Sequence, residues 1–204
     1  MLAAIAFVLA QSAVAVPPAE SESATTRTAV FAGGCFWCVE AVFDQLKGVI
    51  DAESGYCGGT QASAYYEKVH RGATRHAEAV RVTYDPKRIT YSQLLDVFFD
   101  AHDPTQFNRQ GEDDVGRQYR SAIFFATADE KQQAEAKINE LREKKIYRHR
   151  IVTKLEPLTT FYPAENLHQD FARKFPLDPY VQTHAIPKAC QIQLKHPELI
   201  DQGR

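Results

Sequence analysis

The segment from Arg27 to Leu46 limits the fold of this chain more than any other, because a strand pattern there runs through glycines into a helix pattern. Residues 27–31 are typical of a strand, and Gly33 and Gly34 end it. From residue 35 to residue 46, apolar side chains recur on one side at helical spacing. The segment therefore predicts a strand and a helix that share one core.

The rest of the chain continues this alternation of strands and helices. We expect further strands at residues 77–84, 119–126 and 150–156, and helices at 91–101, 129–145 and 164–175. Three glycines in residues 54–59 predict a loop, and residues 103–118 form a long stretch without periodicity. The pattern predicts an α+β fold, a compact two-layer sandwich with a mixed sheet and helices packed on it. It leaves the strand order open.

Composition limits the classes of protein that need to be considered. The chain has 204 residues, 44% of them hydrophobic, which suits one domain with tails. The net charge of −2 gives no general attraction to nucleic acid or to anionic membranes. Four cysteines are too few for a disulfide scaffold, so their positions must carry any chemistry.

The two ends are predicted to lie outside the folded domain. Residues 1–15 are uncharged, too short in their apolar run to span a bilayer, and end in Ala-Val-Ala, as a signal peptide does. We therefore expect export to the periplasm, although an apolar helix or a misplaced start codon, with a cytoplasmic protein, explains the same residues. Residues 16–26 predict a flexible spacer, and residues 191–204 a polar C-terminal tail.

Cys35 is the strongest candidate for a reactive group. It stands where the predicted helix begins, and the free N–H groups there stabilise an anion such as a thiolate. We therefore expect a lowered pKa and a nucleophilic thiol. The alternative is that Cys35 is a small buried hydrophobic residue.

Cys38 makes a C-x-x-C pair with Cys35. In a helix, residues three apart have Cβ atoms about 5–6 Å apart, whereas a disulfide needs about 3.8 Å. The pair can close only if the first turn is distorted. A redox pair, half of a zinc site and coincidence all remain open, but Cys57 and Cys190 stand alone, so we expect no metal site.

Glu78 is the candidate general acid. In the predicted strand it shares a face with Val80, Val82 and Tyr84, which indicates burial. Burial raises the pKa of a carboxyl group and keeps it protonated near pH 7. A salt bridge at the end of the strand is the alternative.

The other candidates depend on their neighbours. Phe36 and Trp37, beside Cys35, suit the wall of an apolar pocket or simple helix packing. Tyr65, Tyr66 and Tyr119 offer hydroxyl donors, and the pair Asp113-Asp114 lies in the long loop.

Together these stretches resemble peptide methionine sulfoxide reductase, type A. The resemblance rests on GGCFWCVE (33–40), SGYCGG (54–59), YYEKVHRGATRHAEAVRVTYDP (65–86), HDPTQFNRQGEDDVGRQYRSAIF (102–124) and FYPAENLHQDF (161–171), and it covers residues 27–190. It implies a thiol-dependent enzyme that reduces the S epimer of methionine sulfoxide, free or in oxidised proteins. It also implies a monomer with no bound cofactor, recycled by an external dithiol such as a thioredoxin-like protein.

The resemblance implies a role for each matching residue. Cys35 aligns with the nucleophile, Glu78 with the acid, and Asp114 with the active-site aspartate. The remaining matches align Tyr66 and Tyr119 with the hydroxyls that bind the sulfoxide oxygen, and Phe36 and Trp37 with the residues that hold the S-methyl group. The loop has one extra residue between Gly111 and Asp114, which brings Asp113 into consideration.

The residue that resolves the sulfenic acid departs from the family pattern. Many members have Gly where this chain has Cys38, and place resolving cysteines in the tail. Cys38, Cys190 and Cys57 are therefore all candidates, with Cys38 favoured, and a small thiol acting directly is a fourth route. General thiol–disulfide exchange by the C-x-x-C pair is the alternative activity, and a non-catalytic module that binds oxidised methionine is another. General thiol–disulfide exchange explains the cysteines but not Glu78 or the tyrosine pair.

Overall fold

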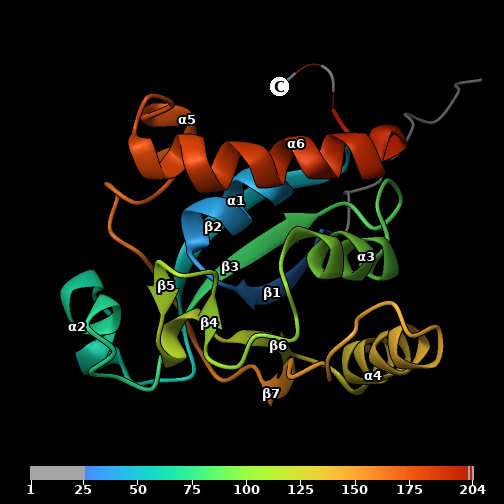
Figure 1. Ribbon diagram of the computed structural model, residues 1–204, viewed down its shortest axis with the longest axis horizontal. Helices are drawn as coiled ribbons and strands as arrows, with labels where there is room; N and C mark the ends of the chain where they lie inside the picture. The colour runs from blue at the N-terminus through green and yellow to red at the C-terminus, as the bar shows by residue number, and fades with distance from the viewer. Residues whose placement is uncertain (1–25, 202, 204) are drawn as a thin grey trace, which may run out of the picture.

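A six-stranded mixed sheet forms the centre of the molecule (Figure 1). The computed structural model describes residues 26–201 and 203, so the predicted signal peptide and almost all of the predicted spacer lie outside the described residues. The strand order is β7-β6-β1-β3-β2-β8, antiparallel throughout except for the parallel pair β6 and β7. The strands are β1 (Arg27–Gly33), β2 (Val49–Cys57), β3 (Ala77–Tyr84), β6 (Ser121–Phe125), β7 (Lys154–Pro157) and β8 (Phe161–Pro163), and a separate hairpin pairs β4 (Arg109–Gln110) with β5 (Asp114–Val115).

The main helices pack against one face of this sheet, which confirms the predicted α+β class. The helix α1 lies over β2 and β3, and α6 crosses α1 as an outer layer (Figure 1). The α-helices are α1 (Phe36–Asp44), α2 (Tyr66–His70), α3 (Tyr91–Ala101), α4 (Ala128–Glu143), α5 (Phe171–Lys174) and α6 (Ile186–Lys195). Shorter helical turns are η1 (Gln61–Ser63), η2 (Arg117–Tyr119), η3 (Val181–Ala185) and η4 (Pro197–Leu199). Among these described helices, none has the length and apolar character needed to cross a membrane.

The main core lies between the sheet and the helices. Phe31, at the centre of β1, is fully buried and stacks on Phe43 of α1 and Phe98 of α3, with both centroid distances 5.1 Å. Buried aromatic pairs of this kind contribute beyond their buried area. They fix α1 on the sheet and thereby fix the position of its first residues.

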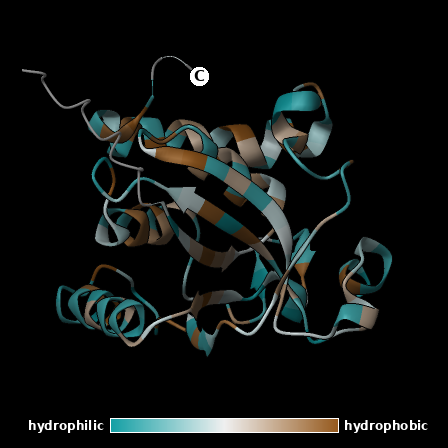
Figure 2. Cartoon of the chain, turned by 180° about the vertical axis from the view of Figure 1, so that it is seen from behind, coloured by the Kyte–Doolittle hydropathy of each residue, from teal (hydrophilic) through white to brown (hydrophobic). Residues whose placement is uncertain are grey.

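A smaller core lies on the opposite face of the sheet. It contains Val30, Ala32, Cys57, Ala79 and Phe124, which alternate with residues of the main core. Figure 2 shows the contrast between the apolar strands and the hydrophilic surface of α4. In α4 only Ala134 and Ile138 are buried, and both belong to the main core, so this helix packs through a narrow stripe on the main-core side.

The predicted loop at residues 54–59 is wrong for most of its length. Residues 54–57 complete β2, between β3 and β8. At Gly55 a Cβ would lie 2.4 Å from the Tyr162 carbonyl oxygen. Glycine is therefore needed here because β8 packs closely against β2, and not because the chain turns.

The predicted helix at residues 164–175 is also wrong, since only α5 is helical. The backbone before α5 is held by other segments instead of by helical bonds. The Ala164 N–H donates to Ser54, and the Gln169 side chain bonds both backbone groups of Ser54. Asp170 then adopts a left-handed conformation, with φ of 54°.

Two further boundaries differ from the sequence-based expectation. The predicted strand at 150–156 is β7, which starts only at Lys154. The predicted boundary between the domain and its tail falls inside α6, because this helix packs on α1 with Ile192 fully buried.

Candidate active site

Cys35 is held where β1 turns into α1. It is the N-cap of α1 with a non-helical backbone (φ −59°, ψ 126°), and the preceding Gly34 has φ of 104°. A Cβ at Gly34 would lie 2.7 Å from the Gln110 side chain, so glycine allows the long loop of residues 103–118 to approach. The thiol is buried at the start of the helix.

The Cys35 thiol is neutral in the resting site. Burial raises its pKa well above the ordinary value, and Cys38, Glu78 and Asp114 raise it further. The predicted lowering of this pKa is therefore wrong for the resting enzyme, because the loss of water outweighs the helix N-terminus.

Glu78 faces the same point from β3, with 2% of its surface exposed. Its Oε2 accepts a hydrogen bond from the Phe36 backbone N–H at 3.1 Å. Burial raises its pKa to about 8, although the bond from Phe36 works in the opposite direction. The predicted burial of this carboxyl is confirmed, and its raised pKa favours the protonated form at pH 7.

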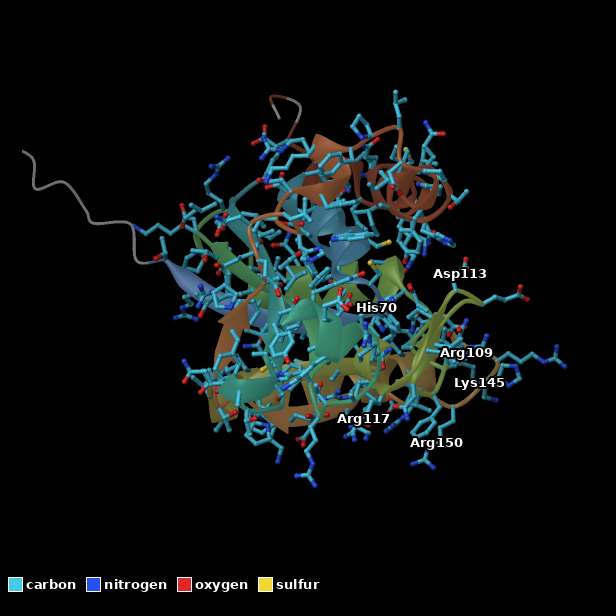
Figure 3. All side chains as sticks on the ribbon, turned by 90° about the vertical axis from the view of Figure 1, so that its left-hand side faces the viewer. His70, Arg109, Asp113, Arg117, Lys145 and Arg150 are labelled. Carbon is cyan, nitrogen blue, oxygen red and sulfur yellow. The ribbon has the colours of Figure 1, made fainter. Side chains whose placement is uncertain are left out.

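Two tyrosines approach Glu78 from α2 and η2. The Tyr119 hydroxyl lies 3.0 Å from Nδ1 of His70, and the Tyr66 ring stacks on His168 at 4.1 Å. Burial raises the pKa of both tyrosines, and the nearby charge of Glu78 raises it further. Both hydroxyls therefore keep their protons as hydrogen-bond donors. His70 is labelled in Figure 3, where it lies near the middle of the view.

The structure distinguishes the two aspartates of the long loop. Asp114 is buried, and its Oδ2 accepts a hydrogen bond from the Tyr180 hydroxyl at 2.7 Å. The same hydroxyl lies 3.9 Å from the Cys38 sulfur. Asp113 is exposed and pairs with His184, so the extra residue of the loop is accommodated outside the site.

Aromatic rings form a wall beside Cys35. Trp37 stacks on Phe171 with a centroid distance of 3.7 Å and an interplanar angle of 8°, and meets the edge of Tyr180. Phe36 is almost fully buried and contacts Trp37 and His168 at its sides. The arrangement suits an apolar group such as S-methyl.

Of the three candidate resolving cysteines, Cys38 alone lies beside Cys35. It is fully buried, and the two side chains share a hydrogen bond. The pair can be this close because the backbone at Cys35 is not yet helical. Both are free thiols in this structure.

Cys57 lies on the opposite face of the sheet from Cys35. It is fully buried in the smaller core, its thiol contacts the Thr160 carbonyl oxygen at 3.4 Å, and burial raises its pKa to about 12. The structure does not bring it to Cys35, because Tyr56 takes the side of β2 that faces α1.

Cys190 is exposed on α6. The neighbouring Ala189 carbonyl accepts a hydrogen bond from Gln45, which follows the last turn of α1. The nine residues of α1 separate Gln45 from Cys35, which places the two about 15 Å apart along the axis. Cys190 therefore lies at the wrong end of α1 for direct reaction.

Four residues of this site were not singled out from the sequence. His168 and Phe171 fall inside the FYPAENLHQDF stretch but carried no role of their own, and His70 falls inside the stretch around Tyr66. Tyr180 had no local signal, since it is one of nine tyrosines and reaches Asp114 only through the fold. Within residues 26–201, the structure has no cluster of His, Cys, Asp and Glu able to hold a metal ion.

Comparison with known proteins settles the family. The family model described as "Peptide methionine sulfoxide reductase" matches residues 27–199. The chain belongs to this family. A Synechocystis sp. protein named "Peptide methionine sulfoxide reductase MsrA 2" is 46% identical over 94% of this chain and 89% of its own length. A Pasteurella multocida relative named MsrA is 48% identical over 85% of this chain and 98% of its own length.

Solved structures agree with this assignment. The reduced form of Mxr1 from Saccharomyces cerevisiae superposes with a TM-score of 0.70 at 36% identity, covering 80% of this chain and 93% of Mxr1. Methionine sulfoxide reductase A of Corynebacterium diphtheriae superposes with a TM-score of 0.65 at 35% identity, covering 74% of this chain and 76% of its own chain. This member of the peptide methionine sulfoxide reductase family is thus a thiol-dependent enzyme of methionine sulfoxide reduction.

Glu40 holds in place the segment that carries Phe171, the stacking partner of Trp37 in the aromatic wall. Its Oε1 accepts a hydrogen bond from the Asp170 N–H at 2.9 Å, and Phe171 follows directly and stacks on Trp37. We expect Glu40→Ala to shift the emission of Trp37, the single tryptophan, and to raise KM several-fold with kcat nearly unchanged. Glu40→Gln keeps the acceptor and should restore both. Parent-like fluorescence and KM in the alanine variant would contradict this role.

Proposed function

We propose that Cys35 attacks the sulfur of methionine S-sulfoxide, free or in a polypeptide, while Glu78 protonates the sulfoxide oxygen. One observation carries the proposal: a neutral thiol, a protonated carboxyl and two tyrosine hydroxyls meet at the start of α1. A sulfoxide needs this set, because its sulfur is attacked only as its oxygen is protonated or hydrogen-bonded.

The oxygen-transfer step balances without any other reactant. The Cys35 thiol loses its proton as its sulfur attacks, and Glu78 gives a proton to the oxygen, which Tyr66 and Tyr119 hold. The sulfur–oxygen bond of the substrate and its transient bond to the Cys35 sulfur then break, the oxygen transfers to Cys35 as a sulfenic acid, and methionine leaves with its sulfur reduced. Glu78 regains its proton from the thiol, so no net proton is consumed.

Cys38 resolves the sulfenic acid in this proposal. Its thiol attacks the Cys35 sulfur, a disulfide forms and water leaves. Its burial beside Cys35 supports the role, whereas Cys57 and Cys190 lie elsewhere. Two electrons must then come from an external dithiol, and a thioredoxin-like protein supplies them by disulfide exchange.

We also propose that the mature enzyme works as an exported monomer. The uncharged leader-like segment of residues 1–15 and its Ala-Val-Ala end support export to the periplasm. Expression of the full chain, followed by fractionation and N-terminal sequencing, tests this. A cytoplasmic protein that keeps residues 1–15 would contradict it.

A single-turnover assay tests the reaction itself. Reduced protein is mixed with racemic methionine sulfoxide without reductant, and methionine, the remaining epimer and free thiols are counted. We expect about one methionine per enzyme, loss of the S epimer alone, and loss of two thiols. No methionine from protein with intact thiols would overturn the proposal and favour general thiol–disulfide exchange.

A further inference from the structure

A second polar pocket lies behind η2 and takes no part in the reaction described above. It has a volume of about 310 Å³ and is lined by Gly58, Arg75, Arg117, Arg120, Lys154 and Glu156. Four of these six residues are cations and one is an anion. The pocket is therefore strongly positive in a chain whose net charge is −2.

The buried Arg120 builds this pocket. Its Nε and Nη2 bond the two carboxylate oxygens of Glu156 at 3.0 and 3.1 Å, which neutralises its charge. Its Nη1 donates to the backbone carbonyls of Arg75 and Arg117 at 3.3 and 3.1 Å. One guanidinium thus ties the start of β3, η2 and β7 together. The pocket is a fixed part of the fold.

Gly58 closes the pocket over Arg120. Its φ is 89°, and a Cβ there would lie 2.8 Å from Nη2 of Arg120. A side chain at this position would both strain the backbone and push on the buried guanidinium. Position 58 therefore requires glycine as long as Arg120 keeps its place in the ion pair.

Three cations remain once Arg120 is paired with Glu156. The side chains of Arg75, Arg117 and Lys154 are exposed and have no hydrogen-bond or ion-pair partner among the described residues. Three like charges around one small pocket repel each other, and an anionic group placed among them relieves this. The pocket therefore suits a carboxylate or phosphate oxyanion.

The position of the pocket indicates where such a group comes from. Arg117 begins η2, whose last residue is Tyr119 of the active site, and Gln118 between them donates to the His70 carbonyl at 2.9 Å. Arg117 and His70 are both labelled in Figure 3. An extended peptide advances about 3.3–3.6 Å per residue. η2 thus joins the pocket to the active site, and a substrate segment that follows η2 from a bound methionine sulfoxide leads toward the pocket.

We propose that this pocket binds an acidic side chain close in sequence to methionine sulfoxide in polypeptide substrates. The proposal rests on the reduction of peptide-bound methionine sulfoxide. Free methionine sulfoxide and neutral peptides do not use the pocket, so it acts on substrate selection and not on the chemical step.

The test compares three substrates: N-acetyl-methionine sulfoxide amide, a neutral peptide, and the same peptide with glutamates two to five residues from the sulfoxide. Arg117→Gln/Lys154→Gln removes two of the three unpaired charges. Lys131→Gln/Lys144→Gln, on α4 and at its C-cap, removes two lysine charges elsewhere and serves as the matched control. We expect the first variant to lower kcat/KM about tenfold for the acidic peptide alone. The control should match the parent, and added salt should weaken the parent's preference.

Each outcome decides between the alternatives. Equal kcat/KM of the parent for acidic and neutral peptides overturns the pocket proposal, as does an equal loss for all three substrates in the variant. If inorganic phosphate binds the pocket while the peptides show no preference, the site is a simple anion site and the proposal fails. If the parent reduces none of the three, the proposed function fails instead.

Discussion

We expect Glu78→Gln to lower kcat for methionine sulfoxide by about 10²–10⁴-fold at pH 7. Glutamine keeps the oxygen that accepts the Phe36 N–H, so the start of α1 should stay in place. Glutamine cannot protonate the sulfoxide oxygen, and an unprotonated oxygen is a poor leaving group, so attack on the sulfur becomes slow. Stopped-flow measurement of methionine release in a single turnover reports this step directly. A parent-like rate would remove Glu78 from the acid role.

The same substitution should raise the free energy of unfolding near neutral pH. In the folded protein the pKa of Glu78 is about 8, and in the unfolded chain it is near the ordinary value of 4.5. Folding therefore takes up a proton between these pH values and becomes less favourable as pH rises through them. Glutamine has no such penalty. The variant should gain about 3 kcal/mol at pH 7 and almost nothing below pH 4.

The parent enzyme should also lose activity as pH rises past about 8, because Glu78 then ionises. Glu112→Gln, in the exposed loop, removes a carboxylate outside the site and serves as a control for both measurements. It should change neither the rate nor the pH dependence of stability. Urea unfolding at a series of pH values separates the two variants.

We expect Cys38→Ser to separate the two halves of the cycle. The variant should still release about one methionine per enzyme, because Cys35, Glu78 and the tyrosines are intact. It should lose one thiol instead of two and hold a sulfenic acid that a specific carbon nucleophile can trap. With a dithiol protein as reductant, steady-state turnover should fall by at least tenfold.

Cys57→Ser and Cys190→Ser are the matched controls for this experiment. Both remove one thiol, but neither residue lies at the start of α1. Each should lose two thiols per turnover and keep steady-state activity. Normal disulfide formation in Cys38→Ser, with loss of it in Cys190→Ser, would show that α6 moves and that Cys190 is the resolver.

Residues with a strong local signal were predictable from the sequence. Cys35 follows a strand and two glycines, and Glu78 shares a strand face with apolar residues, so each position could be derived before the fold was known. The α+β class followed from the alternation of strands and helices. The wall formed by Trp37 was expected, but Phe171, its stacking partner, was not.

What could not be predicted depends on contacts between distant segments. Gly58 and Gly59 do lie in a loop, but Gly55 lies in β2, because sequence alone does not reveal that the neighbouring strand β8 needs its space. Residues 164–170 have helical spacing, but their backbone groups bond to Ser54 and Glu40 instead. Tyr180 contacts Asp114 across 66 positions of sequence. The predicted lowering of the Cys35 pKa was wrong for a similar reason. Burial raises this pKa, and burial is a property of the whole fold.

The neutral state of the resting Cys35 thiol has a consequence for survival under oxidants. Peroxides attack thiolates, and repeated attack carries a cysteine past the sulfenic stage to sulfinic acid, which is irreversible in most proteins. A buried, protonated thiol is a poor target for such small oxidants while the enzyme is idle. With Cys38 as the proposed resolving cysteine, the sulfenic acid is exposed to overoxidation only until that thiol condenses with it. Burial thus protects the repair enzyme from the damage that creates its substrate.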